Sequence, residues 1–294
     1  MHDFRLSLPV LVALLAPASL AAATPNASPA ALRDALTFHA AFDGTADATL
    51  ARGDRQVYTA AERTKREAAA PGLPAEARIA RGEGRFGDAL EFRGKTKAQV
   101  FYHGGANLGY KPANWSGSVS FWMRLDPEKD LEPGYCDPFQ FVAQAWNEGN
   151  LFVEFSKDHT PRHFRFGIMA VTKYWNPQNR KYEEMPDAER PIAPVHQHPF
   201  RRDRWTHVLV TFANINSGTT DGRGTLYLDG KRQAAMSGWN HTFNWDVTKS
   251  ALTLGLNYTG FLDDFAIFDR ELTADEVTTV FTLPRGVSGL HATP

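Results

Sequence analysis

The chain has 294 residues and a formal net charge of −1, with 32 Lys and Arg against 33 Asp and Glu. This balance argues against a nucleic-acid-binding protein, which carries a basic excess. A 43% share of hydrophobic residues excludes a wholly disordered chain. The single cysteine, Cys136, excludes an intramolecular disulfide and a thiolate metal cluster.

Residues 1–23 have the layout of a secretory signal peptide. Arg5 precedes an apolar run over residues 6–16, and small residues follow up to Ala23. The alternative is a membrane anchor, but the run is shorter than the ~20 residues that a spanning helix needs. No other stretch is as apolar, so we expect an exported protein without a membrane span, either secreted or periplasmic.

Residues 24–35 are predicted to be an alanine-rich linker, and most of the chain after them is predicted to be strand. Residues 118–125 show this most clearly, because the apolar side chains at odd positions share one face of an extended chain. Similar runs cover residues 139–146, 151–156, 163–171, 205–212, 226–228, 252–256 and 261–268.

The chain contains one clear helix signal. Thr273 can act as an N-cap, and Glu276 has the spacing of a capping box. Many short strands with little helix favour a β-sandwich or barrel over a βαβ fold. The sequence contains no repeat of fixed period, which argues against a propeller or solenoid. We therefore predict an all-β protein with two antiparallel sheets.

Several local strings resemble those of laminin-G-like, concanavalin A-like jelly rolls of the lectin/glucanase superfamily. The strongest is the closing string Phe261–Val277, FLDDFAIFDRELTADEV. Five others occur in the family's order: Phe42–Gly44, Gly84–Phe92, Ser118–Arg124, Trp205–Val208 and Leu226–Lys231. The resemblance implies a jelly-roll β-sandwich of two curved sheets over residues 36–285, followed by a tail over residues 286–294. It also implies glycan or protein binding more often than catalysis.

The resemblance further implies a structural calcium ion near the edge of the sandwich. The family's ligand positions correspond to Asp43 and Asp264 here, and carboxylate oxygens suit Ca²⁺. The alternative is that Asp43 ends a strand in a turn with Gly44 while Asp264 caps backbone groups. A zinc site is less favoured, because His196 and His198 have no third ligand at a local spacing.

The predicted strands also place a set of polar and aromatic side chains on one outward face. A pyranose packs its C–H face on Trp and pairs its hydroxyls with Gln, Glu and Arg, so this face suits a sugar on the concave sheet. The alternative is a solvated face with a cross-strand ion pair between Glu154 and Arg165. The predicted face consists of Gln140, Gln144, Trp146, Glu154, His163 and Arg165.

A second candidate feature is the long connection over residues 172–204. Long loops are usually functional or disordered, and its prolines and aromatics favour an ordered loop folded over a sheet face. Tyr174, Trp175, His196 and His198 could wall a binding groove. Alternatively, the aromatic side chains only anchor the loop to the sandwich.

We therefore predict a carbohydrate-binding, lectin-like module with a polysaccharide or other glycan as its partner. One alternative is an enzyme on the same scaffold, either a glycoside hydrolase or a polysaccharide lyase. The catalytic candidates are Glu154, His163, Arg165 and Tyr174, although a hydrolase needs two carboxylates and the outward face clearly supplies only Glu154. A second alternative is an extracellular protein-interaction module. The oligomeric state is not predicted.

Overall fold

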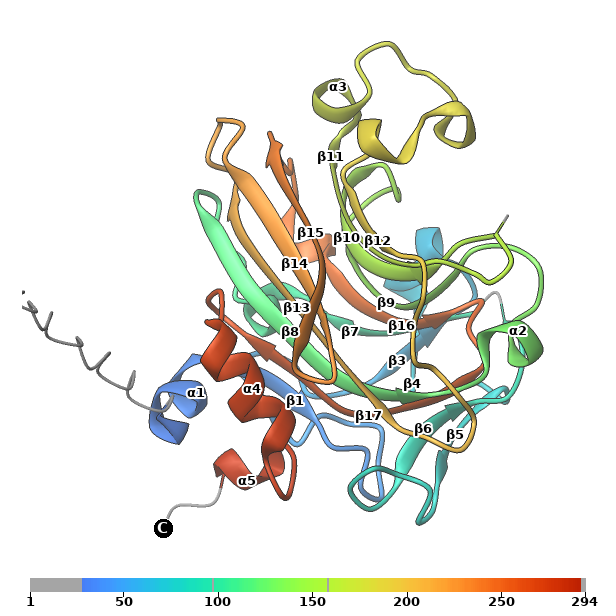
Figure 1. Cartoon of the computed structure of the whole chain (residues 1–294). Coiled ribbons are helices and arrows are strands. Elements are labelled where there is room, and N and C mark those ends of the chain that lie inside the picture. The colour runs from blue at the N-terminus through green and yellow to red at the C-terminus, as the bar shows by residue number, and fades with distance from the viewer. Residues whose placement is uncertain (1–27, 97, 158, 292–294) are drawn as a thin grey trace, which may run out of the picture.

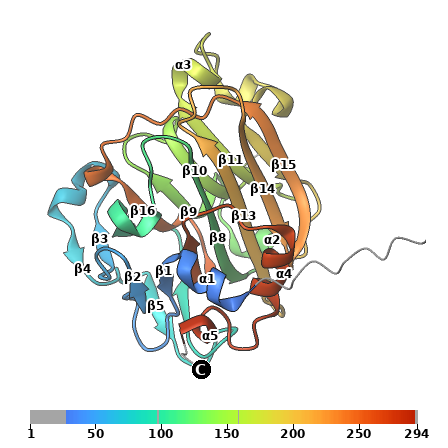
Figure 2. The same ribbon diagram turned by 90° about the vertical axis from the view of Figure 1, so that its left-hand side faces the viewer.

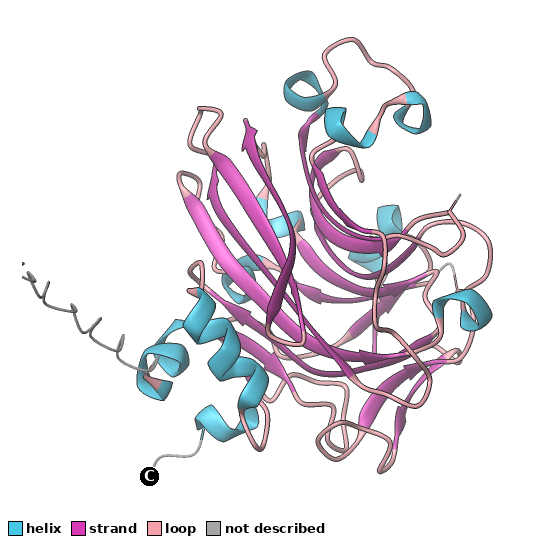
Figure 3. Cartoon of the chain, in the orientation of Figure 1, coloured by secondary structure: helices cyan, strands magenta, loops and turns pink. Residues whose placement is uncertain are grey.

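The computed structural model describes residues 28–96, 98–157 and 159–291. Two antiparallel β-sheets pack face to face, and short helices lie around them (Figures 1 and 3). The predicted all-β sandwich of two antiparallel sheets is confirmed. The predicted signal peptide at residues 1–23 lies outside the described residues, and none of the described helices is long and apolar enough to cross a membrane.

The larger sheet contains nine strands. Its central strand β8 (Trp115–Arg124) pairs with β13 (Thr206–Ile215) on one side and with β17 (Gly260–Phe268) on the other. The remaining strands are β15 (Lys231–Trp239), β14 (Gly222–Leu228), β1 (Leu36–Ala40), β2 (Leu50–Ala51), β6 (Ala89–Phe92) and β5 (Ala77–Ala80).

The second sheet contains eight strands and bends strongly (Figure 1). Its spatial order is β12, β11, β10, β9, β16, β7, β3 and β4. These strands are β12 (Ile192–Val195), β11 (Phe164–Val171), β10 (Glu148–Phe155), β9 (Cys136–Val142), β16 (Ala251–Leu256), β7 (Gln99–His103), β3 (Tyr58–Ala60) and β4 (Ala70–Pro71).

The main core lies between the two sheets, and alternation along the strands fills it. The predicted inward residues of residues 118–125 are all buried there, as are Phe139 and Phe141 of β9. The residues predicted to point inward from β10 and β11 are also buried in this core, which confirms the faces predicted for these strands. These residues are Leu151, Val153, Phe155, Phe164, Phe166 and Ile168. The polar side chains between these positions must therefore lie on the outer face of the eight-stranded sheet.

Three helices cover the outer face of the nine-stranded sheet: α1 (Pro29–Ala35), α4 (Ala274–Thr282) and α5 (Ser288–His291). They lie on the same side of the molecule in both ribbon views (Figures 1 and 2). The capping box predicted at Thr273 and Glu276 is present at the start of α4, with the Glu276 N–H donating to Thr273 Oγ1.

The predictions of a linker before the domain and a tail after it need correction. The described part of the predicted linker (24–35) forms α1, because Ala and Leu favour a helix after Pro29 and Leu32 and Ala35 are buried against the sheet. The predicted tail (286–294) also belongs to the fold over its described residues. Val287 and Leu290 are buried in the same cluster.

The connection between β11 and β12 carries three helical turns: α3 (Thr172–Trp175), η3 (Tyr182–Glu184) and η4 (Asp187–Glu189). We call this connection, residues 172–190, the overhanging segment, because it projects over the hollow side of the bent eight-stranded sheet (Figure 1). Trp175, Tyr182 and Met185 pack on outward residues of β10 and β11, including Phe152 and Met169.

Candidate functional site

A cavity of about 390 Å³ lies on the outer face of the eight-stranded sheet, below the overhanging segment. We call it the Glu154 cavity. Strands β9 and β10 supply its floor, and the overhanging segment supplies one wall. The residues that line it are Arg63, Tyr135, Asp137, Gln140, Trp146, Asn150, Phe152, Glu154, Tyr182, Glu183 and Leu256.

A buried ion pair sits in the floor of this cavity. Glu154 on β10 faces Arg165 on β11 in the strand register, and the Arg165 guanidinium donates to Glu154 Oε1. Both side chains are buried. The cross-strand pair considered from the sequence is therefore present, but the face is not solvated, because the overhanging segment and Tyr135 cover it. The Arg165 guanidinium lies 5.3 Å from the centre of the Tyr135 ring.

A second carboxyl group stands beside this pair. Asp137, at the start of β9, accepts a hydrogen bond of 2.7 Å from Gln140 Nε2 through its Oδ2 atom. Burial and the nearby negative charge of Glu154 raise the pKa of Asp137 well above its ordinary value. Burial also raises the pKa of Glu154, against the opposing charge of Arg165. Burial thus favours a proton on Asp137, whereas the charge of Arg165 favours the ionised form of Glu154.

Four polar atoms in and beside the cavity have no hydrogen-bond partner within the described part of the chain, although each atom is buried. They are Asp137 Oδ1, Asn150 Oδ1, Arg165 Nε and the Tyr182 hydroxyl. Leaving such a group unpaired costs about 1–3 kcal/mol, and native proteins satisfy most of them. Unpaired donors and acceptors gathered around one cavity are typical of a site that a polar ligand completes.

Aromatic side chains form the mouth of the cavity. Trp146, in the turn between β9 and β10, is 45% exposed, and its ring meets the edge of the Tyr182 ring at 5.4 Å between centroids. The Tyr182 ring in turn lies 6.4 Å from Tyr135. Large aromatic surface left in water at the entrance of a polar cavity is where a sugar ring packs.

The structure brings only some of the predicted site residues together. Gln140, Trp146 and Glu154 line the Glu154 cavity. Arg165 lies behind Glu154 and lines an adjoining cavity of about 170 Å³. Gln144 lies beyond the end of β9, where the alternation predicted up to residue 146 has already stopped, and it lines a different cavity.

Other predicted residues lie away from the Glu154 cavity. His163 and His196 face each other across the β11–β12 edge, with 3.1 Å between His163 Nε2 and His196 Nδ1. Burial lowers the pKa of His163 to about 4, so it is a neutral base. His198 packs on Phe155 and lies 3.0 Å from the Arg162 carbonyl oxygen.

The sequence analysis considered two roles for the aromatic residues of the overhanging segment, wall of a binding groove and anchor of the loop, and the structure shows both. Trp175 is 5% exposed and anchors the segment, with its indole N–H donating to the Asn147 carbonyl at 3.3 Å. Tyr174 is 38% exposed and lines neither the Glu154 cavity nor the two cavities that contain Gln144 and Arg165. Tyr182, by contrast, forms part of the cavity wall.

Sequence reasoning missed Asp137, Asn150 and Arg63. Asn150 lies two residues before Phe152 on the outward face of β10, and the alternation there could have found it. Pro138 and a register shift between β9 and β10 hide Asp137. Arg63 lies in η1 (Arg63–Ala68), where no periodic pattern placed it near the sheet.

The calcium site that the family resemblance implies stays a prediction, and both of its carboxylates already have contacts within the fold. Asp264 Oδ1 lies 2.8 Å from His39 Nε2, and Asp264 Oδ2 accepts the Val287 N–H at 2.9 Å. Asp43 Oδ1 accepts the Asp88 N–H at 2.9 Å. Within the described ranges no three His, Cys, Asp or Glu residues gather as a metal site.

The fold and the site now permit a comparison with known proteins. The family model of the concanavalin A-like lectin/glucanases superfamily matches residues 102–278, which is more than half of the chain. The chain belongs to this superfamily. A search of the curated proteins finds no match.

Solved structures show the same fold at low sequence identity. Domain 4 of AbnA, a GH43 extracellular arabinanase from Geobacillus stearothermophilus solved in complex with arabinotriose, superposes with a TM-score of 0.51 at 14% identity, over 83% of this chain and 97% of that domain. The binding domain of botulinum neurotoxin DC in complex with SialylT gives 0.53 at 14% identity, over 85% of this chain and 52% of that one.

A third structure, from work on the two ganglioside molecules needed for cell entry of botulinum neurotoxin type C, gives 0.51 at 16% identity, over 90% of this chain and 54% of that one. The chain thus spans about half the length of the two toxin structures.

Proposed function

We propose that this protein is a carbohydrate-binding module that holds a glycan in the Glu154 cavity. The observation that carries the proposal is the set of unpaired buried polar atoms of Asp137, Asn150 and Tyr182 around a cavity whose mouth exposes Trp146. Sugar hydroxyls both donate and accept hydrogen bonds, so they can satisfy carboxyl, amide and phenol groups together. The indole face of Trp146 then covers the apolar face of the ring.

The relatives support this function without naming the ligand. The AbnA domain was solved with an arabinose oligosaccharide, and the toxin structures concern sialylated ligands or gangliosides. The N-terminal segment 1–23 adds the proposal that the module acts outside the cytoplasm, secreted or periplasmic, where polysaccharides are met.

The test is gel retardation followed by calorimetry. The purified protein is run through gels that contain neutral, uronate-rich or sulfated polysaccharides, and the retarding polymer is titrated in solution. Trp146→Ala and Asn150→Ala are expected to weaken binding by about 10-fold or more. Tyr174→Ala is the matched control, because it removes an exposed aromatic of the overhanging segment that lines no described cavity. Equal losses in all three variants, or no retardation on any polymer, would contradict the proposal.

One observation favours a second candidate, a glycoside hydrolase on the same site. The Glu154 cavity contains Asp137 and Glu154 in its floor, and the pKa of Asp137 is raised, which is the direction that a general acid requires. This candidate predicts new reducing ends from the bound polysaccharide over a day of incubation. Asp137→Asn and Glu154→Gln would each abolish that release. Retardation without any release of reducing ends would contradict the hydrolase and support the binding module.

A further inference from the structure

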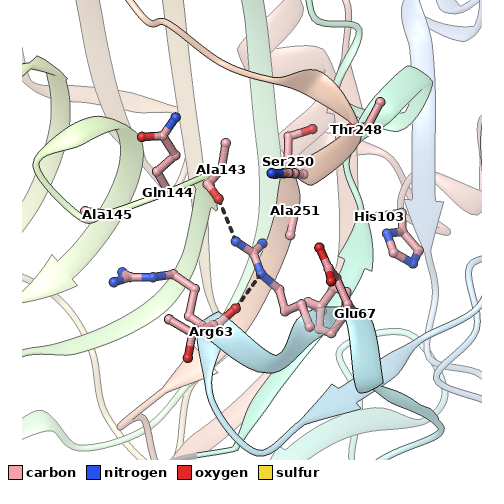
Figure 4. Close-up of a pocket in the computed structure, with 13 residues that line it drawn as sticks. Arg63, Glu67, His103, Ala143, Gln144, Ala145, Thr248, Ser250 and Ala251 are labelled. Atoms are coloured by element: carbon pink, nitrogen blue, oxygen red, sulfur yellow. Dashed lines mark hydrogen bonds between the residues drawn. The ribbon is translucent and has the colours of Figure 1, made fainter.

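A second and larger cavity adjoins the first on the same face of the eight-stranded sheet. It encloses about 570 Å³ between η1, the end of β9 and the start of β16 (Figure 4), and Phe101 of β7 is among the residues that line it. We call it the Phe101 cavity. Arg63 lines both cavities, so the two cavities adjoin at this side chain, and we call them together the groove.

Arg66 fixes the η1 wall in place. Its guanidinium donates to the carbonyl oxygens of Arg63, Val142 and Ala143, at 3.3, 3.3 and 2.9 Å. It also lies 5.9 Å from the centre of the Phe101 ring. Its donors are used on backbone oxygens, and no carboxylate of the described residues shifts its pKa, so Arg66 brings a positive charge to the groove.

Arg63 carries a second positive charge that the described part of the chain does not neutralise. Its side chain extends toward Gln144 and Ala145, whereas Glu67 lies on the other side, near His103 and Ala251 (Figure 4). Burial lowers the pKa of Arg63, with no carboxylate acting in the opposite direction. Burial and the charge of Arg63 together lower the pKa of Arg66 to about 10.

The charges that line the two cavities therefore differ. In the Glu154 cavity Glu154 pairs with Arg165 and Glu183 pairs with Lys157, and burial raises the pKa of Asp137. In the Phe101 cavity Arg63, Arg66 and Lys249 face a single carboxylate, Glu67. The carboxylates of the first cavity thus have cations or a raised pKa, whereas positive charge is in excess in the second cavity, beginning at the shared Arg63.

We propose that the groove binds an acidic glycan, with an uncharged sugar in the Glu154 cavity and the carboxylate or sulfate of a neighbouring sugar against Arg63 in the Phe101 cavity. A guanidinium binds such planar or tetrahedral oxyanions through paired N–H donors. Half-burial strengthens that attraction over its value in open water. This inference rests on the proposed carbohydrate-binding function and adds the chemical class of the ligand.

The experiment compares one polysaccharide in two charge states. The native acidic polymer and its carboxyl-reduced form share a backbone, and a sulfated polymer and its desulfated form provide a second pair. Calorimetry is run on the wild type, on Arg63→Gln and on Arg232→Gln. Arg232 is the matched control, because it is an exposed arginine on β15 of the other sheet and removes the same charge.

We expect the wild type to bind the acidic form about 10- to 100-fold more tightly than the neutral form. Arg63→Gln should remove that preference, while Arg232→Gln should keep it. Arg63→Lys should retain part of it, since the charge remains without the paired donors. The polymer pair that shows the preference identifies carboxylate or sulfate.

Two results would overturn the inference. Equal affinity for both charge states in the wild type would mean that no oxyanion is recognised. Equal weakening by Arg63→Gln and Arg232→Gln would mean that only net charge matters. Either result leaves the carbohydrate-binding proposal intact. By contrast, a wild type that binds neither form of any polymer would overturn the proposed function itself.

Discussion

Asp137 occupies an unusual position for a carboxyl group, since one oxygen accepts from Gln140 and the other has no partner among the described residues. Its pKa is raised, first by burial and then by the charge of Glu154. The folded protein therefore keeps this proton at a higher pH than the unfolded chain, whose aspartates titrate near 3.9. Stability is lost as the pH rises above that value, because the native state binds more protons than the unfolded state.

The first prediction follows from this loss of stability with rising pH. Asp137→Asn keeps the hydrogen-bonding shape but cannot ionise, so its free energy of unfolding should equal that of the wild type near pH 4 and exceed it by a growing margin as the pH rises from there. The gap should grow by at most about 1.4 kcal/mol per pH unit. Urea unfolding at several pH values measures it. Parallel pH profiles for the two proteins would show that Asp137 ionises freely in the native state.

The second prediction concerns the buried pair of Glu154 and Arg165. Removing one partner leaves an uncompensated buried charge, which costs about 3–5 kcal/mol, whereas removing both can be close to neutral. Arg165→Met should therefore destabilise the protein strongly, and Glu154→Leu combined with Arg165→Met should recover much of the loss. Thermal or urea unfolding of the single and double variants completes the cycle. A double variant that is as unstable as the sum of the singles would contradict the pairing.

The overhanging segment is the element that turns a sheet face into a cavity. Trp175, Tyr182 and Met185 fasten it to Phe152 and Met169 of the sheet. If Trp175 is the anchor, Trp175→Ala should cost about 3–5 kcal/mol locally and raise amide hydrogen exchange throughout residues 172–190 before the sheets exchange. Tyr174→Ala should leave exchange unchanged. Unaltered exchange in Trp175→Ala would show that the segment is held from elsewhere.

The sequence predicted the strands whose apolar residues alternate and missed strands without that alternation. Strands β8, β10 and β11 were found because their inward positions are apolar at every second residue. Strand β15 was missed because it forms an edge of the sheet and exposes most of its side chains, so few of its positions are apolar. Segment 143–146 was extended too far as a strand, since its two alanines satisfy the pattern without having to be buried in the core.

The site was predictable only within single strands and their immediate partners. Glu154 and Arg165 share a face and a register position, which alternation can identify. Arg63 and Asp137 meet in one cavity from segments that are far apart in the chain, and η1 carries no strand pattern. No local sequence pattern connects these two residues, so the places of Asp137 and Arg63 in the site could be found only from the three-dimensional structure.

At the scale of the whole molecule, buried neutral histidines set the acid limit of stability. Burial lowers the pKa of both His207 and His241 to about 3, while His207 lies 2.9 Å from Ser120 Oγ through its Nε2 atom. In the unfolded chain they titrate near 6.5. Between about pH 6.5 and pH 3 the unfolded state binds these protons and the native state does not, so stability falls as the pH falls.

The fourth prediction is a loss of about 1.4 kcal/mol per pH unit for each such histidine below pH 6.5. His241→Gln should remove one share of this slope, and His207→Gln should remove another. Urea unfolding between pH 4 and pH 7 measures the slopes. If both variants kept the full wild-type slope, the histidines would be shown to accept protons in the folded state.

The most direct test of the central claim is a crystal structure of the protein with an oligosaccharide cut from the polymer that retards it. The account predicts a sugar ring against Trp146, with hydroxyl oxygens within hydrogen-bond distance of Asn150 Oδ1 and the Asp137 carboxyl. An oligosaccharide bound elsewhere, on the nine-stranded sheet or on the loop around Asp43, with the Glu154 cavity holding only water, would contradict it.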